Sequence, residues 1–228
     1  MYHDFNYEAT LSSSLRAQWQ LDDVLREDQE LDFSRNFMPE SLARTGAISS
    51  LNAFEQKVLN QISAHQYLTI FGVVEEFILP FLLDHARPHL LNDDWRVRAI
   101  LNFASEEAKH IHLFKRYHAA FARGFPVECE MIGPSEAIGA EVLRHDPLAV
   151  GLVILMIEWM TQQHYLGSIK DDGDIDPLFK SHGLGQGVAE VHAVPARQQR
   201  RVHDRPGHQV DGSGRGDAQA GDLGPVHA

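Results

Sequence analysis

Three stretches of this chain have the apolar periodicity of long helices, and each of them carries a glutamate among its apolar residues. In residues 101–118, LNFASEEAKHIHLFKRYH, apolar side chains recur at steps of three and four, as on a helix face that packs against a core. Glu107 falls on this face, and His110 follows three residues later on the same side. A buried carboxylate without a partner costs several kcal/mol or takes up a proton, so a fold that buries Glu107 must compensate its charge.

The other two stretches repeat this anomaly. Glu75 and Glu76 lie within FGVVEEFILPFLL, and each borders an apolar stripe of the predicted helix. Glu158 lies in the middle of LVILMIEWM, where no rotation of a helix exposes the carboxylate while burying its neighbours. Explanations without a metal are a solvated Glu-x-x-His pair, one solvated glutamate at 75 or 76, and a Glu158 that is protonated or paired with a buried Arg or His.

A metal ion bound between the three helices would compensate the charges of all these buried carboxylates together. Carboxylate oxygens with one imidazole suit iron or manganese, whereas a structural zinc site prefers cysteine and histidine. The chain has one cysteine, Cys129, which can form neither an internal disulfide nor a thiolate site. The candidate ligands are therefore Glu75 or Glu76, Glu107, His110 and Glu158.

Capping signals set the limits of the predicted helices. Asn52 and Glu55 have the spacing of a capping box, and Asp146 with Pro147 places a capping side chain before a proline that suits the first helical position. On this basis the sequence predicts long helices over 53–85, 95–123 and 147–167, a short connecting helix over 133–143, and the start of a fourth core helix at Asp176 and Pro177.

The two ends of the chain differ in composition from this helical region. Residues 1–50 are polar and weakly periodic, which predicts a partly helical lead-in to a helical domain over 51–181. Residues 182–228 contain no Ile, Phe, Tyr, Trp or Met, too little apolar surface to offset the entropy of ordering the segment. Except for Ser213, they use only amino acids with codons that begin in G or C. The segment is therefore either an out-of-frame translation of a GC-rich gene or a natural disordered tail of biased composition.

Composition narrows the expected partners and location. The 32 acidic and 20 basic residues give a net charge of −12, which argues against nucleic acid or an anionic membrane, because phosphates need a basic surface. The most apolar run, 148–160, is too short to span a bilayer comfortably, and the N-terminus lacks the features of a secretory signal. We therefore expect a cytoplasmic protein with neither nucleic acid nor membrane as a partner.

The order of the candidate ligands resembles that of the ferritin-like di-iron carboxylate superfamily. A glutamate at 75 or 76 is followed about thirty residues later by Glu107-x-x-His110, and then by Glu158. In that superfamily a four-helix bundle supplies one Glu from each of two helices and one Glu-x-x-His from each of the other two. The resemblance covers about residues 51–180 and implies an all-α bundle that binds two iron ions, or iron and manganese.

One element of the family pattern is missing. A second Glu-x-x-His is expected shortly after DPLFKS, and this sequence has none there. The resemblance therefore implies an incomplete ferritin-like bundle, with its fourth core helix lost, and an impaired activity. The extra N-terminal segment and EEAKHIHLFKRYH are more similar to oxygenases of the p-aminobenzoate N-oxygenase type and to ribonucleotide reductase small subunits than to iron-storage ferritins.

This resemblance implies an enzyme that activates O₂ and oxidises a small organic substrate with electrons from an unidentified donor. It implies no catalytic residue beyond the metal ligands, and it makes Phe71, Phe103 and Trp159 candidate pocket walls. The alternatives are a non-catalytic bundle that binds metal or a partner helix, and a truncated chain without a complete site. In both alternatives the apolar faces left by a missing helix favour a homodimer, a larger oligomer or aggregation.

Overall fold

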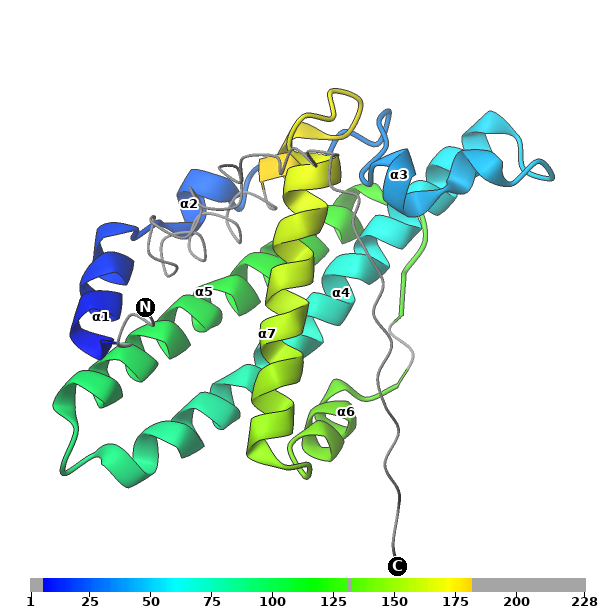
Figure 1. Ribbon diagram of the computed structural model, residues 1–228. Helices are drawn as coiled ribbons and strands as arrows, with labels where there is room; N and C mark the ends of the chain where they lie inside the picture. Colours follow the sequence, from blue (N-terminus) through cyan, green and yellow to red (C-terminus); the bar gives the residue numbers. More distant parts are fainter. Residues whose placement is uncertain (1–5, 131–132, 182–228) are drawn as a thin grey trace, which may run out of the picture. The chain divides into compact units, whose positions relative to one another are not determined.

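A computed structural model describes residues 6–130 and 133–181 of the chain (Figure 1). Within these ranges every regular element is helical, and the single β-bridge, between Asn36 and Ile175, is isolated. The prediction of an all-α protein is therefore confirmed. The described residues all belong to one compact unit, Met1–Val194, whereas the expectations for 182–228 lie outside them.

The two longest helices, α4 (Ala53–Ala86) and α5 (Asp94–Gly124), pack along each other and are joined by a short turn. The capping box before α4 is complete, because the Asn52 side chain accepts hydrogen bonds from the first turn and the Glu55 carboxylate accepts one from the Asn52 N–H. The Asp93 side chain caps α5 by accepting a hydrogen bond from the Arg96 N–H. Both helices agree with their predicted limits to within one or two residues.

The remaining helices also follow the sequence signals. The predicted connecting helix is α6 (Ser135–Val142), which contacts α4. The third long helix is α7 (Pro147–His164), with Asp146 as its N-cap, and it continues into a π-helical turn, η3 (Tyr165–Ile169). A further helical turn begins after Asp176, whose buried carboxylate accepts hydrogen bonds from the N–H groups of Phe179 and Asp32.

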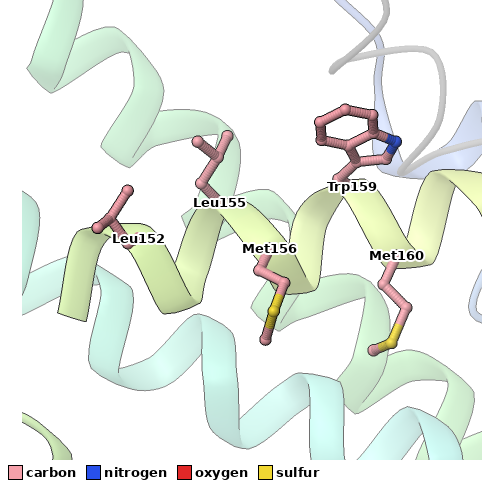
Figure 2. Close-up of a pocket in the computed structure, with 5 residues that line it drawn as sticks. All are labelled: Leu152, Leu155, Met156, Trp159 and Met160. Atoms are coloured by element: carbon pink, nitrogen blue, oxygen red, sulfur yellow. The ribbon is translucent and has the colours of Figure 1, made fainter. Parts of the chain in front are cut away.

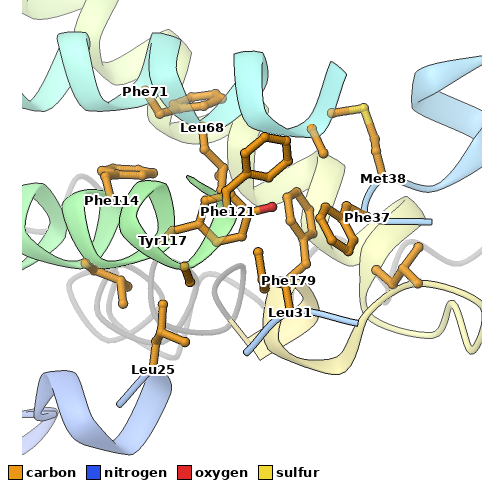
Figure 3. Packing of buried hydrophobic residues seen from close by; sticks show 14 of the residues in the cluster. Leu25, Leu31, Phe37, Met38, Leu68, Phe71, Phe114, Tyr117, Phe121 and Phe179 are labelled. Atoms are coloured by element: carbon orange, nitrogen blue, oxygen red, sulfur yellow. The ribbon is translucent and has the colours of Figure 1, made fainter. Parts of the chain in front are cut away.

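The N-terminal region is helical in short pieces and is part of the same core. Its side chains pack with those of α4 and α5 and with Phe179 in the larger of two apolar clusters (Figure 3). The composition of residues 1–50 did not predict this contribution. The helices of the N-terminal region are α1 (Tyr7–Arg16), α2 (Leu21–Val24), α3 (Glu40–Ala43) and η1 (Thr45–Ala47). A further short helix, η2 (Arg87–His89), lies between α4 and α5. Its buried apolar residues are Leu11, Trp19, Leu25, Leu31, Phe37 and Met38.

By length and composition, one helical stretch of the described residues, Ala53–His89, is apolar enough to cross a membrane. Buried side chains make up 39% of its most apolar window, and the core helix of a soluble protein has these same properties.

One buried amide, that of Asn60 on α4, ties the N-terminal region to the long helices. Its Oδ1 accepts hydrogen bonds from the backbone N–H groups of Phe37 at 2.9 Å and Met38 at 3.0 Å. Its Nδ2 donates to the backbone carbonyl of Met38 at 2.7 Å. The side chain is inaccessible to solvent, so no water can replace these partners.

We predict that Asn60→Ala lowers the free energy of unfolding by about 2–4 kcal/mol, because two buried N–H groups and a carbonyl lose their partners. Chemical denaturation followed by circular dichroism measures this loss. Gln66→Ala, at an exposed position of the same helix, is the control and should change stability little. Equal effects of the two substitutions would contradict the role assigned to Asn60.

Candidate metal centre

Glu75, Glu107 and His110 meet between α4 and α5, although Glu75 is 32 residues before Glu107 in the sequence. The Nδ1 atom of His110 lies 2.9 Å from Oε2 of Glu107 and 3.5 Å from Oε1 of Glu75. One ligand atom of each side chain lies within 4.8 Å of those of the other two. All three residues are 2% exposed. The structure therefore brings together three of the five sequence candidates in a buried group.

The periodicity of each helix explains this placement. On α4, Glu75 lies on the same stripe as Leu68, Phe71 and Ile78, all of which are buried. On α5, Glu107 lies on the stripe that also carries the buried residues Ala104 and Phe114. Because α4 and α5 pack along these stripes, the polar side chains on them must face each other across the interface.

The other two candidates lie elsewhere. Glu76 is exposed, so Glu75 is the glutamate of this pair that faces the core. Glu158 is half-buried on α7 and is not a member of the three-residue group. Its apolar neighbours Leu155, Met156 and Trp159 are exposed, contrary to the expectation that they would be buried, because the described residues supply no helix that covers this side of α7. The assignment of Glu158 as a metal ligand stays a prediction.

Of the three aromatic residues predicted to line a pocket, one is buried and two are exposed. Phe71 is buried in the core beside α5, whereas Phe103 and Trp159 are exposed. Trp159 lines a surface groove on α7 rather than an enclosed cavity beside the three ligands.

Burial and mutual contact shift the pKa values of all three groups. Burial, reinforced by the charge of Glu107, raises the pKa of Glu75 well above its ordinary value. Burial also penalises the Glu107 carboxylate, but hydrogen bonds from His110 and Glu75 outweigh it and lower the pKa of Glu107. Burial disfavours a charged His110, yet hydrogen bonds to both carboxylates raise the pKa of His110 well above its ordinary value. Without a metal, these shifts favour the protonated forms of Glu75 and His110 and the ionised form of Glu107.

The three side chains could hold one metal cation, because their ligand atoms all lie within 4.8 Å of one another. Metal–oxygen and metal–nitrogen bonds of about 2.0–2.2 Å place neighbouring ligand atoms about 3.0–3.4 Å apart. The two Nδ1–oxygen distances, 2.9 and 3.5 Å, lie close to this range. Two carboxylates also balance the charge of a divalent ion, which would take the place of the protons at Glu75 and His110. A second cation would need ligands beyond these three residues.

Trp19, which the sequence did not indicate, completes the surroundings of His110. Its indole stacks on the imidazole with ring centres 5.7 Å apart and planes inclined by 19°. The ammonium group of Lys109 lies 5.4 Å from the indole centre and forms an ion pair with Glu106. Trp19 lies in a weakly periodic region 91 residues before His110, so no local sequence pattern connects them. The two rings lie nearly parallel, and both side chains are buried.

No protein-family model, curated protein or solved structure matches this chain. The resemblance to di-iron carboxylate proteins, which rests on the order and spacing of the ligands, therefore stays a prediction.

We predict that Glu75→Gln raises the melting temperature of the metal-free protein at about pH 7.5. The folded state holds the Glu75 proton above the ordinary pKa of 4.5, so stability is lost as the pH rises through this range. A glutamine of similar shape has no proton to lose and removes that cost. Differential scanning calorimetry in chelator measures the change, and the advantage should shrink towards about pH 4.5, where the wild-type carboxyl is protonated as well.

The control for this comparison is Glu76→Gln, because Glu76 is the exposed neighbour of Glu75. We expect this variant to melt within about 1 °C of the wild type. A Glu75→Gln variant that melts well below the wild type at neutral pH would contradict the protonation assigned to Glu75.

Proposed function

We propose that this chain binds a first-row transition metal, iron or manganese, through Glu75, Glu107 and His110. The observation that carries the proposal is the near-complete burial of two carboxyl groups and an imidazole whose ligand atoms all lie within 4.8 Å of one another. Such a group is costly in an apolar core unless a proton or a cation compensates it. Oxygen ligands with one imidazole favour iron or manganese.

The residues around the site perform definable tasks in this function. Glu75 and His110 release their protons when a cation binds, and Glu107 remains ionised throughout. The stacked Trp19 holds the imidazole in one plane, and the apolar side chains of α4 and α5 exclude bulk water. Iron bound at this position would supply redox chemistry with O₂.

We further propose, from the resemblance of the ligand order, that the chain derives from a di-iron oxygenase that oxidises a small organic substrate. Its complete form would be a ferritin-like four-helix bundle with two irons, or iron and manganese, and would receive electrons from a separate donor in the cytoplasm. Glu158 would be a ligand of the second metal in that form. The absence of a second Glu-x-x-His from the sequence supports an impaired activity in this chain.

A non-catalytic, metal-binding helical bundle is the second candidate. It is favoured by the small size of the buried group, which among the described residues contains only three candidate ligands, one of them a histidine. A single cation with these ligands would stabilise the contact between α4 and α5 without any substrate.

Metal titration tests the proposal. We expect the wild-type chain to bind Mn²⁺ or, without oxygen, Fe²⁺, and we expect Glu107→Gln and His110→Gln each to weaken binding by at least about 100-fold. Glu76→Gln should bind as the wild type does. Isothermal titration calorimetry and the electron paramagnetic resonance of Mn²⁺ measure affinity and stoichiometry. Equal affinity of the wild type and His110→Gln would refute the site.

The same titration separates the two candidates. A stoichiometry of two that falls to one in Glu158→Gln, together with O₂ consumption by the ferrous protein, supports the oxygenase. A stoichiometry of one that Glu158→Gln leaves unchanged, without O₂ consumption, supports the non-catalytic bundle.

A further inference from the structure

Helix α7 is apolar on two opposite sides, but the described residues bury only one of them. Val150, Ile154 and Thr161 face α4 and the smaller apolar cluster and are buried. The opposite side carries a stripe of large apolar side chains, each between 43% and 72% exposed. This exposed stripe consists of Leu148, Leu152, Val153, Leu155, Met156, Trp159 and Met160. A helix that is apolar all round is normally covered on all sides.

The spacing of the stripe is that of a helix-pairing seam. On α7, Leu148, Leu152, Leu155 and Trp159 follow one another at steps of four, three and four residues, and Met156 and Met160 border this line. From Leu148 to Met160 the stripe is about 18 Å long, or between three and four helical turns. Figure 2 shows the side chains of its middle section, which line a shallow groove of about 350 Å³. Methionine side chains adapt readily to a surface that packs against them.

The rest of the chain supplies no segment that matches this stripe. Residues 182–228 contain two leucines and no aromatic residue, and the other residues outside the described ranges are 1–5 and 131–132. None of these segments has the length and apolar content of a helix that could act as the partner of the stripe.

We infer that this partner is a second copy of the chain, which pairs its own α7 with this one about a two-fold axis. A standard interface buries about 800 Å² of each partner, and a row of large apolar side chains, each at least 43% exposed, is the kind of surface that supplies it. A two-fold contact places the same patch on both subunits, and an apolar stripe is complementary to itself.

Charge opposes a contact between two copies least at this stripe. The chain carries a net charge of −12, so two copies repel each other over most of their surface. The exposed stripe contains no charged side chain, and the only acidic residue of α7, Glu158, lies half-buried at its edge. If the two α7 helices run antiparallel, their dipoles also attract each other. The stripe is therefore a surface on which two acidic copies can approach closely.

Sedimentation velocity and light scattering of the purified full chain test this inference. We expect a concentration-dependent dimer for the wild type. Leu155→Glu and Leu155→Lys, near the middle of the stripe, should each raise the dimer dissociation constant by at least about 100-fold, because they bury like charges at the interface. An equimolar mixture of the two variants should recover dimers, because the opposite charges then meet. Leu91→Glu, at a fully exposed leucine outside α7, should dimerise as the wild type does.

A second readout does not depend on a substitution. Trp159 is 65% exposed in the single chain and would be covered in the dimer, so its emission should shift to the blue and resist acrylamide quenching as the concentration rises. A wild-type chain that remains monomeric at about 100 μM overturns the inference, and so does Leu155→Glu that dimerises as the wild type does. Flotation of a monomeric wild type with phosphatidylcholine vesicles would instead assign the stripe to a lipid surface.

Discussion

The contact between Glu75 on α4 and the Glu107–His110 pair on α5 is the constraint on which the rest of the structure depends. Three ionisable side chains at 2% exposure cannot remain in an apolar interface unless their charges are compensated. In the metal-free chain protons provide this compensation, and the pKa values of all three groups shift accordingly. A cation that takes the place of these protons would join the two longest helices at their middle, so metal binding and the stability of the fold are coupled.

The surroundings of this group are built from segments that are distant in the sequence. The N-terminal region contributes Trp19 to one side of His110 and adds apolar residues to the core that α4 and α5 form. The Asn60 amide fixes part of that region to α4 by satisfying two N–H groups and a carbonyl. The water-poor environment of this buried group is therefore a product of the whole described fold and not of two helices alone.

Local patterns predicted the helices and the burial of Glu107 and His110, and they narrowed the third member of the group to Glu75 or Glu76, because these features depend on periodicity and capping within a single segment. Glu75, Glu107 and His110 lie on apolar stripes that can be read from their immediate neighbours. Trp19 could not be predicted, because its contact with His110 depends on how the N-terminal region folds back onto α5. The expected burial around Glu158 was wrong for a related reason, since the apolar residues of α7 indicate that a helix should be covered but do not specify what covers it. That information lies in tertiary and quaternary contacts.

The measurement that tests the central claim most directly is an anomalous difference map from a crystal of the chain grown with Mn²⁺. The account predicts a peak between the carboxylates of Glu75 and Glu107 and the Nδ1 atom of His110, and no peak at this position in a crystal of His110→Gln. A manganese peak only at exposed acidic residues, with the buried group still joined by its own hydrogen bonds, would contradict it.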